Sequence, residues 1–124
     1  MNKPRPVYLD LSKIRMPVMA VVSILHRISG VVLFLAIPYI LYIWNQSLAT
    51  ASTYDEIHNA LQSCWTRGLV YLILLALLYH WVAGIRHLLM DMGVGEEKIS
   101  GRRGARIVLV VVVLLAMGLG VWLW

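Results

Sequence analysis

Two apolar stretches of this 124-residue chain contain histidine and arginine side chains that can take part in chemistry. The sequence SILHRISG places His26 beside Arg27, and the sequence YHWVAGIRHLLMD contains His80 and His87. A neutral imidazole can ligate a metal, and a guanidinium can bind an anionic group such as a carboxylate. Because burying such groups in hydrocarbon costs several kcal/mol, we interpret them as functional residues.

The composition around these side chains is that of a membrane protein. Hydrophobic residues make up 60% of the chain and charged residues only 14%, whereas a typical soluble domain has about 25% charged residues. At about 1.5 Å per residue, each of three apolar runs with its flanks can cross a hydrocarbon core about 30 Å thick. We therefore predict an all-α integral membrane protein, a single membrane-anchor domain over 1–124, with transmembrane helices at about 18–44, 66–91 and 105–124.

Basic residues set the expected orientation of these spans. They precede the first span and surround the connection between the second and third, at Lys3, Arg5, Lys13, Arg15, Arg86, Lys98, Arg102, Arg103 and Arg106. The connection between the first two spans has only Arg67, at its far end. The positive-inside rule therefore predicts a cytoplasmic N-terminus and an external C-terminus. The net charge of +5 is explained by topology, and we do not expect nucleic-acid binding.

Two further features limit the class of protein. The first span is too long for the h-region of a signal peptide and lacks a small-x-small cleavage site, so we expect it to be retained. Cys64 is the single cysteine. The chain alone therefore cannot form an internal disulfide or a cysteine-rich iron–sulfur or zinc site.

Helical periodicity places three residues on one face of the second span. His80, Gly84 and His87 lie at i, i+4 and i+7, close to two full turns. His80 is near the midpoint of the span, and His87 lies about 12 Å from that midpoint towards the cytoplasm. A glycine beside a histidine lets a flat, bulky group approach the backbone closely.

A second polar group lies on the first span. Ser23, His26 and Arg27 lie at i, i+3 and i+4 and so share one face. Antiparallel packing of the first two spans brings this face to the level of Arg86 and His87, near the cytoplasmic surface. The histidine at the midpoint of the second span is expected to lie alone beneath this group.

These depths suggest a site for haem. A neutral imidazole at mid-membrane suits axial ligation of haem iron by His80, and the cationic group of His26, Arg27, Arg86 and His87 suits haem propionates, which point towards water. Alternatively, the histidine forms an interhelical hydrogen bond and the arginines snorkel to the surface. The chain offers no second histidine at that depth, so a six-coordinate haem takes its other ligand from another polypeptide.

Ser23 and Arg27 suggest a quinone site near the same surface. A quinone needs a hydrogen-bond donor for each carbonyl oxygen, and a hydroxyl and a guanidinium on one helical face supply such donors. The alternative for Ser23 is a hydrogen bond to the backbone of its own helix, which is common in membranes.

Two motifs carry a resemblance to a known family, S-x-x-H-R-x-S-G in the first span and H-x-x-x-G-I-R-H-x-x-x-D in the second. The chain resembles the large cytochrome b556 anchor subunits of bacterial succinate dehydrogenase, or complex II. The resemblance covers nearly the whole chain in order, length and three-span layout. The loop between the first two spans and the third span match only in character.

The resemblance implies an anchor subunit of the bacterial cytoplasmic (inner) membrane that is not an enzyme alone and has no catalytic residue for the dicarboxylate chemistry. Its partners are a flavoprotein subunit that oxidises succinate, an iron–sulfur subunit that relays electrons to ubiquinone, and a second anchor subunit. The two anchors share one haem b. The resemblance makes His80 an axial ligand, places His26, Arg27, Arg86 and His87 around the propionates, and assigns Ser23 and Arg27 to ubiquinone.

Two alternatives stay open. Within the same class, the chain could anchor a quinol:fumarate reductase that works in the opposite direction with menaquinol. From a different class, it could be a small transporter or a structural helix bundle without haem.

Overall fold

The structure is a computed structural model that describes residues 16–124. Along the chain it contains the helices α1 (Val18–Ser47), α2 (Ala51–Leu61), α3 (Cys64–Asp91) and α4 (Lys98–Leu123), and the described part has no strand. The helices α1, α3 and α4 are each long and apolar enough to cross a membrane. The predicted all-α fold with three transmembrane helices is therefore confirmed. The orientation stays a prediction, because Lys3, Arg5, Lys13 and Arg15 lie outside the described residues.

The third transmembrane helix begins earlier than the apolar run that predicted it. Helix α4 starts at Lys98 rather than near residue 105, and its first turns carry Arg102 and Arg103. Gly93 and Gly95 both have a φ of +83°, which glycine adopts without strain, and they let the chain turn back after α3. Charged residues do not prevent helix formation, so α4 includes basic turns before its apolar segment.

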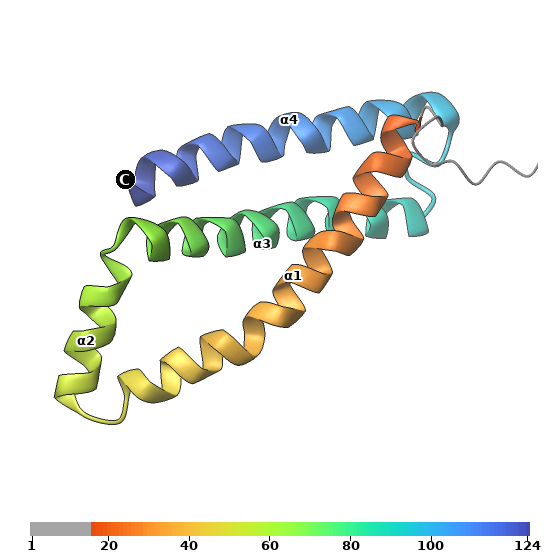
Figure 1. Cartoon of the computed structure of the whole chain (residues 1–124). Coiled ribbons are helices and arrows are strands. Elements are labelled where there is room, and N and C mark those ends of the chain that lie inside the picture. Colours follow the sequence, from red (N-terminus) through yellow and green to blue (C-terminus); the bar gives the residue numbers. More distant parts are fainter. Residues whose placement is uncertain (1–15) are drawn as a thin grey trace, which may run out of the picture.

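A short helix lies within the first connection. Helix α2 begins at Ala51, because Thr50 caps it. The Thr50 hydroxyl accepts a hydrogen bond from the Thr53 backbone N–H at 3.1 Å, and the Thr53 hydroxyl accepts one from the Thr50 backbone N–H at 3.1 Å. Figure 1 shows α2 lying across the gap between the end of α1 and the start of α3.

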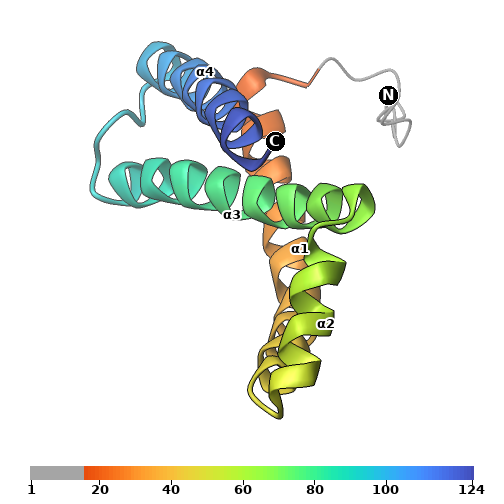
Figure 2. The same cartoon turned by 90° about the vertical axis from the view of Figure 1, so that its left-hand side faces the viewer.

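The core of the molecule is small and lies at one end. Figures 1 and 2 show α1 crossing α3 obliquely, and the first half of α4 contributes to the core near this crossing. The core residues there are Val22, Tyr79, Ala83, Ala105, Val108 and Val112. Small side chains such as Ala83 and Ala105, both fully buried, let the helix backbones approach closely. At the other end, α1 and α4 diverge and α2 joins α1 to α3.

Side-chain hydrogen bonds to backbone carbonyls fasten the three long helices together. The Tyr79 hydroxyl donates to the carbonyl of Val22 on α1 at 3.0 Å. The Tyr71 hydroxyl donates to the carbonyl of Ala116 on α4 at 3.1 Å. A helical carbonyl has a second lone pair, so it can accept such a bond without leaving its helix. In a bilayer these bonds satisfy polar hydrogens that lipid cannot satisfy.

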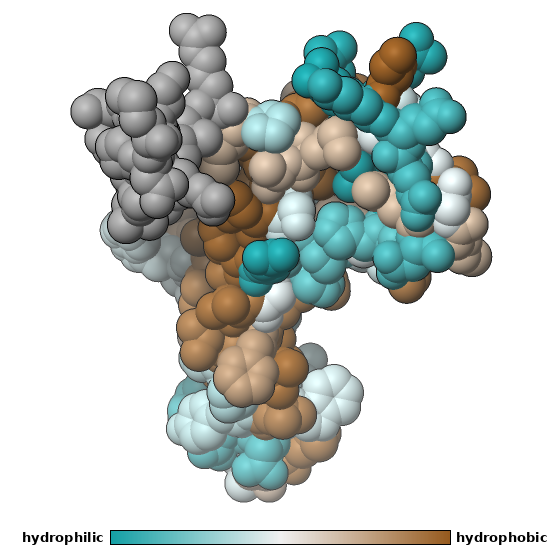
Figure 3. Space-filling view, turned by 90° about the vertical axis from the view of Figure 1, so that its right-hand side faces the viewer, coloured by the Kyte–Doolittle hydropathy of each residue, from teal (hydrophilic) through white to brown (hydrophobic). Residues whose placement is uncertain are grey.

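Most of the apolar surface is left uncovered by this fold. Phe34 is 72% exposed and Val121 is 83% exposed. Figure 3 shows hydrophilic residues over the α3–α4 connection and around α2, with a hydrophobic stretch between them. Lipid or other membrane-embedded protein must cover that stretch, because large apolar patches are unstable in water.

Two glycines of α4 provide a test of this packing. A Cβ at Gly101 would lie 3.2 Å from the Gly95 carbonyl oxygen and 3.2 Å from Cε of Met19, whereas a Cβ at Gly118 would meet nothing within 4 Å. We expect Gly101→Ala to lower the free energy of unfolding, because overpacking costs about 1–3 kcal/mol, which exceeds a helix-propensity gain of about 1 kcal/mol. Gly118→Ala should raise the free energy of unfolding by that helix-propensity gain, because no overpacking offsets it. Thermal unfolding in detergent, followed by circular dichroism, measures both, and equal melting temperatures would contradict the packing.

Candidate functional site

Two histidine–glycine contacts form the crossing of α1 and α3. His26 and Gly30 are four residues apart on α1, and His80 and Gly84 are four residues apart on α3. A Cβ at Gly30 would lie 3.1 Å from Cε1 of His80, and a Cβ at Gly84 would lie 3.4 Å from Nε2 of His26. Each helix thus leaves room at its glycine for the imidazole of the other helix. The flat group that approaches Gly84 is the ring of His26.

Three imidazoles meet at this crossing, and we call His26, His80 and His87 the histidine cluster. The rings of His26 and His80 are stacked, with centroids 4.1 Å apart and an angle of 15° between their planes. The rings of His26 and His87 are tilted by 46° at a centroid distance of 4.9 Å. We expected His80 to lie alone beneath the other two, and this expectation was wrong for its side chain. The ring contacts His26 because Gly30 has no side chain to hold it away.

The hydrogen bonds around His80 identify the nitrogen that carries the proton. Nδ1 of His80 lies 3.1 Å from the carbonyl oxygen of His26 and 3.1 Å from Oγ of Ser29. The Ser29 hydroxyl donates its own hydrogen to the His26 carbonyl at 2.7 Å. A carbonyl can only accept, so Nδ1 must be the donor to both oxygens. Nε2 of His80 is therefore the nitrogen with the free lone pair.

The unused nitrogens of the cluster indicate what it can bind. Nε2 of His80 has no hydrogen-bond partner among residues 16–124. Nε2 of His26 and Nδ1 of His87 are buried without any partner. Buried polar atoms are nearly always paired, so unpaired ones point to a missing ligand or partner. The cluster thus offers the Nε2 of His80 as a nitrogen suited to a metal, and buried nitrogens of His26 and His87 that are suited to hydrogen-bonded groups.

The histidine cluster is not a site for a bare metal ion. Within the described range, no group of three or more His, Cys, Asp or Glu side chains converges to hold one. A metal bound through His80 must therefore bring most of its ligands with it, or take them from another chain. Haem iron would meet this requirement, because its porphyrin supplies most of the ligands of the metal.

Ser23 and Arg27 lie on α1 next to the cluster, one turn apart. The Ser23 hydroxyl makes no hydrogen bond with any described residue, unlike the hydroxyls of Ser29 and Ser47, which donate to carbonyls of α1 at 2.7 Å. Ser23 is half-buried and Arg27 is exposed. The alternative for Ser23, a bond to its own helix, is therefore not what this structure contains. Both donors remain available to a ligand.

Arg86 lies apart from the histidine cluster. Its guanidinium Nη2 donates to the carbonyl of Gly101 on α4 at 3.2 Å, and a Cβ at Gly104 would lie 3.5 Å from its Nε. The residue is buried, with only 8% of its surface exposed. Arg86 therefore fastens α3 to α4, while its neighbour His87 faces α1.

Sequence reasoning missed Ser29 and Gly30, which contact His80 directly. A signal for Gly30 was present, because the spacing H-x-x-x-G occurs in both helices, at His26–Gly30 and His80–Gly84. Nothing in the sequence distinguished Ser29 from an ordinary helix serine. Its role depends on which residue of α3 lies opposite.

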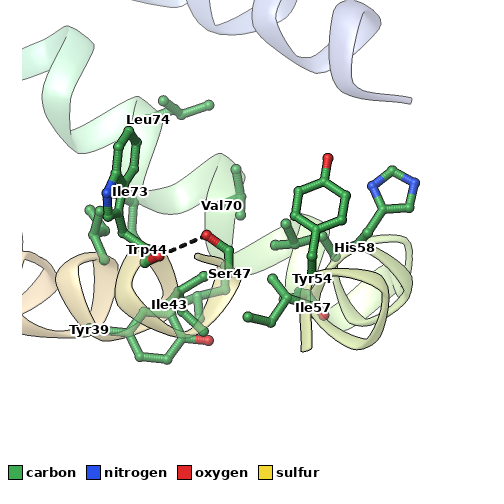
Figure 4. A pocket seen from close by; sticks show the side chains of 14 residues that line it. Tyr39, Ile43, Trp44, Ser47, Tyr54, Ile57, His58, Val70, Ile73 and Leu74 are labelled. Atoms are coloured by element: carbon green, nitrogen blue, oxygen red, sulfur yellow. Dashed lines mark hydrogen bonds between the residues drawn. The ribbon is translucent and has the colours of Figure 1, made fainter. Parts of the chain in front are cut away.

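A cavity of about 380 Å³ lies at the other end of the molecule, between α1, α2 and α3. Figure 4 shows aromatic and aliphatic side chains around it, including Tyr39, Trp44, Tyr54 and Ile73. His58 lies at its edge on α2, in stacked contact with Tyr54. The residues of the histidine cluster do not line this cavity, so we place the candidate site at the α1–α3 crossing.

Comparison with known proteins gives a consistent result. Residues 1–119 match the family model described as the succinate dehydrogenase/fumarate reductase transmembrane subunit. The chain is 44% identical over 125 residues to the succinate dehydrogenase cytochrome b556 subunit of Coxiella burnetii, covering 100% of both chains. It is 37% identical to the protein of that name from Rickettsia bellii, over 73% of this chain and 70% of the relative. It is 31% identical to the succinate dehydrogenase cytochrome b560 subunit of Reclinomonas americana, over 78% and 71%.

The contact between Gly30 and His80 can be tested directly. We expect Gly30→Ala to displace the His80 ring, because the added methyl would lie 3.1 Å from Cε1. In the chain labelled with 15N-histidine and dissolved in detergent micelles, the imidazole signals of His80 should shift while those of the remote His58 stay. Gly68→Ala is the matched control, since a Cβ there meets nothing within 4 Å. Unchanged His80 signals in Gly30→Ala would contradict the described crossing.

Proposed function

The chain belongs to the family of succinate dehydrogenase/fumarate reductase transmembrane subunits, and we propose that it is the large anchor of a succinate:ubiquinone oxidoreductase. In this role it holds the soluble subunits at the membrane, binds haem b together with a second anchor subunit and contributes to the site of ubiquinone reduction. It is one subunit of an oxidoreductase complex and not an enzyme alone.

The observation that carries the proposal is the pair of hydrogen-bond acceptors at Nδ1 of His80. Its Nδ1–H is held by the His26 carbonyl and Ser29, which leaves the Nε2 lone pair for iron. The ring of His26 is stacked on the face of the His80 imidazole and does not lie at its Nε2 edge. Bound haem b supplies a one-electron redox centre with a potential set by its ligands and their surroundings. The second anchor subunit would supply the other histidine ligand.

Three residues of the chain are available for the haem propionates. His26 and His87 have buried nitrogens without partners, and Arg27 lies beside His26 on α1. Hydrogen bonds from such groups to carboxylates are stronger than bonds between neutral groups. Arg86, which we expected among these residues, is bonded to Gly101, and we assign it to the packing of α4.

Ser23 and Arg27 form the part of the ubiquinone site that this chain supplies. The Ser23 hydroxyl has no intrahelical bond and can donate to one quinone carbonyl. The Arg27 guanidinium stabilises the negative charge that develops on the quinone oxygen as electrons arrive. Both residues lie within one turn of His26, so quinone and propionates share this side of α1 and Arg27 serves both.

The remaining parts of the proposal concern the complex. The partners are a flavoprotein subunit, an iron–sulfur subunit and a second anchor, in the cytoplasmic membrane of a bacterium. The family name covers fumarate reductase as well, and an anchor that oxidises menaquinol is the second candidate. The purified complex distinguishes them by its relative rates of ubiquinone reduction with succinate and of menaquinol oxidation with fumarate.

We expect His80→Ala to abolish or strongly weaken the b-type band in the reduced-minus-oxidised spectrum of the purified complex. The change removes an iron ligand that this chain does not replace. His58→Ala, on the exposed helix α2, is the control and should keep the band. Co-purification of the flavoprotein and iron–sulfur subunits with this chain shows that the complex is assembled. An assembled complex with an unchanged band in His80→Ala would exclude this ligand.

Ser23→Ala should lower kcat/KM for ubiquinone by about threefold to tenfold, the equivalent of one hydrogen bond. The rate with a soluble artificial acceptor should stay the same, because succinate oxidation does not involve this chain. Ser47→Ala removes a similar hydroxyl at the far end of α1 and should change neither rate. Equal loss of both rates in Ser23→Ala would indicate damage to assembly, and unchanged ubiquinone reduction would exclude Ser23 from the site.

A further inference from the structure

We propose that Ser29 is a positioning residue that fixes the orientation and basicity of the His80 imidazole. This inference rests on the proposed function, because it concerns the haem that His80 ligates. Ser29 does not contact the iron in this role. It acts through Nδ1 of His80, on the opposite side of the ring from the ligating nitrogen.

The hydroxyl of Ser29 is itself held in a single orientation. The side chain is only 6% exposed, and its hydrogen is donated to the His26 carbonyl at 2.7 Å. The oxygen lone pairs must then point away from that carbonyl, and Nδ1 of His80 lies 3.1 Å from the oxygen. A hydroxyl fixed in this way can only accept the proton of Nδ1.

The His26 carbonyl is a second acceptor for the same N–H of His80. It lies 3.1 Å from Nδ1 of His80, the same distance as Oγ of Ser29. Gly30 limits the position of the ring edge, and the stacked ring of His26 limits its tilt. These contacts restrict the orientation of the His80 imidazole. The two acceptors also determine its tautomer, because they require the proton to be on Nδ1.

A comparison within α1 separates this role from ordinary helix packing. Ser47 makes the same bond to its own helix, from Oγ to the Trp44 carbonyl at 2.7 Å. No histidine nitrogen among the described residues bonds to the Ser47 hydroxyl, whereas Ser29 carries the bond to His80 in addition. The two serines thus share their local chemistry and differ in the contact to the imidazole.

This contact has a consequence for the haem. An acceptor on Nδ1–H increases the basicity of Nε2, and a more basic ligand stabilises ferric over ferrous iron. Removing the Ser29 hydroxyl leaves the His26 carbonyl as the one remaining acceptor. We therefore expect haem to be retained in Ser29→Ala and its midpoint potential to rise.

The test uses the complete membrane complex with Ser29→Ala, Ser29→Thr and Ser47→Ala. Redox titration of the b-type band should give a reduced-to-oxidised ratio about twofold to tenfold higher at a fixed potential in Ser29→Ala, the equivalent of one neutral hydrogen bond. Threonine keeps the hydroxyl, so Ser29→Thr should return the ratio towards that of the unmodified complex. Ser47→Ala should leave it unchanged.

Two results would overturn the inference. The first is an unchanged midpoint potential in Ser29→Ala with haem bound, which would make Ser29 a packing residue. The second is loss of haem that is the same in Ser29→Ala and Ser29→Thr, which would show a requirement for shape rather than for the hydroxyl. Failure of the proposed function would give different results. The unmodified complex would then show no b-type band, or the band would stay intact in His80→Ala.

Discussion

The site depends on two consecutive residues of α3 that bond to the backbone of α1. Tyr79 and His80 reach the carbonyls of Val22 and His26, which are one turn apart. In hydrocarbon a polar hydrogen finds its partner within the protein or stays unpaired at a cost of several kcal/mol. The two bonds therefore fix the register of α1 against α3, and a shift of either helix by one residue would break both. The contact at Gly30 and the stacking of the histidine rings follow from that register.

The strength of packing differs between the two ends of the molecule. At the end with the histidine cluster, the small core and the Arg86 bond to Gly101 hold α1, α3 and α4 together. At the other end the helices diverge, and α2 spans the gap (Figure 1). A site that holds cofactors needs supporting contacts of this kind, because a loosely held imidazole loses the geometry required for ligation. The open end and the exposed apolar faces are left for lipid and for partner subunits.

Much of the fold could be predicted from the sequence, whereas less of the site could. Apolar runs and helical rise locate the spans and the approximate level of each polar residue, because length and depth are properties of a single helix. The direction in which a side chain faces a neighbouring helix depends on how two helices are rotated against each other. Arg86 and His87 illustrate this, because they are adjacent on α3 and yet Arg86 bonds to Gly101 on α4, whereas the ring of His87 lies beside that of His26 on α1. The contact between Ser29 and His80 could not be predicted from the sequence for the same reason.

The same local pattern gives different results on the two helices. His26 and His80 each precede a glycine by four residues, and each ring lies over the glycine of the opposite helix. His26 places its Nε2 towards Gly84, where this nitrogen is buried without a hydrogen-bond partner. His80 instead places Nδ1 towards Gly30, Ser29 and the His26 carbonyl, which leaves Nε2 without a partner. The difference lies in which ring edge is turned towards the glycine of the opposite helix. Of this pair, His80 is the ring held through Nδ1 by two acceptors, and its proposed role as an iron ligand depends on this difference.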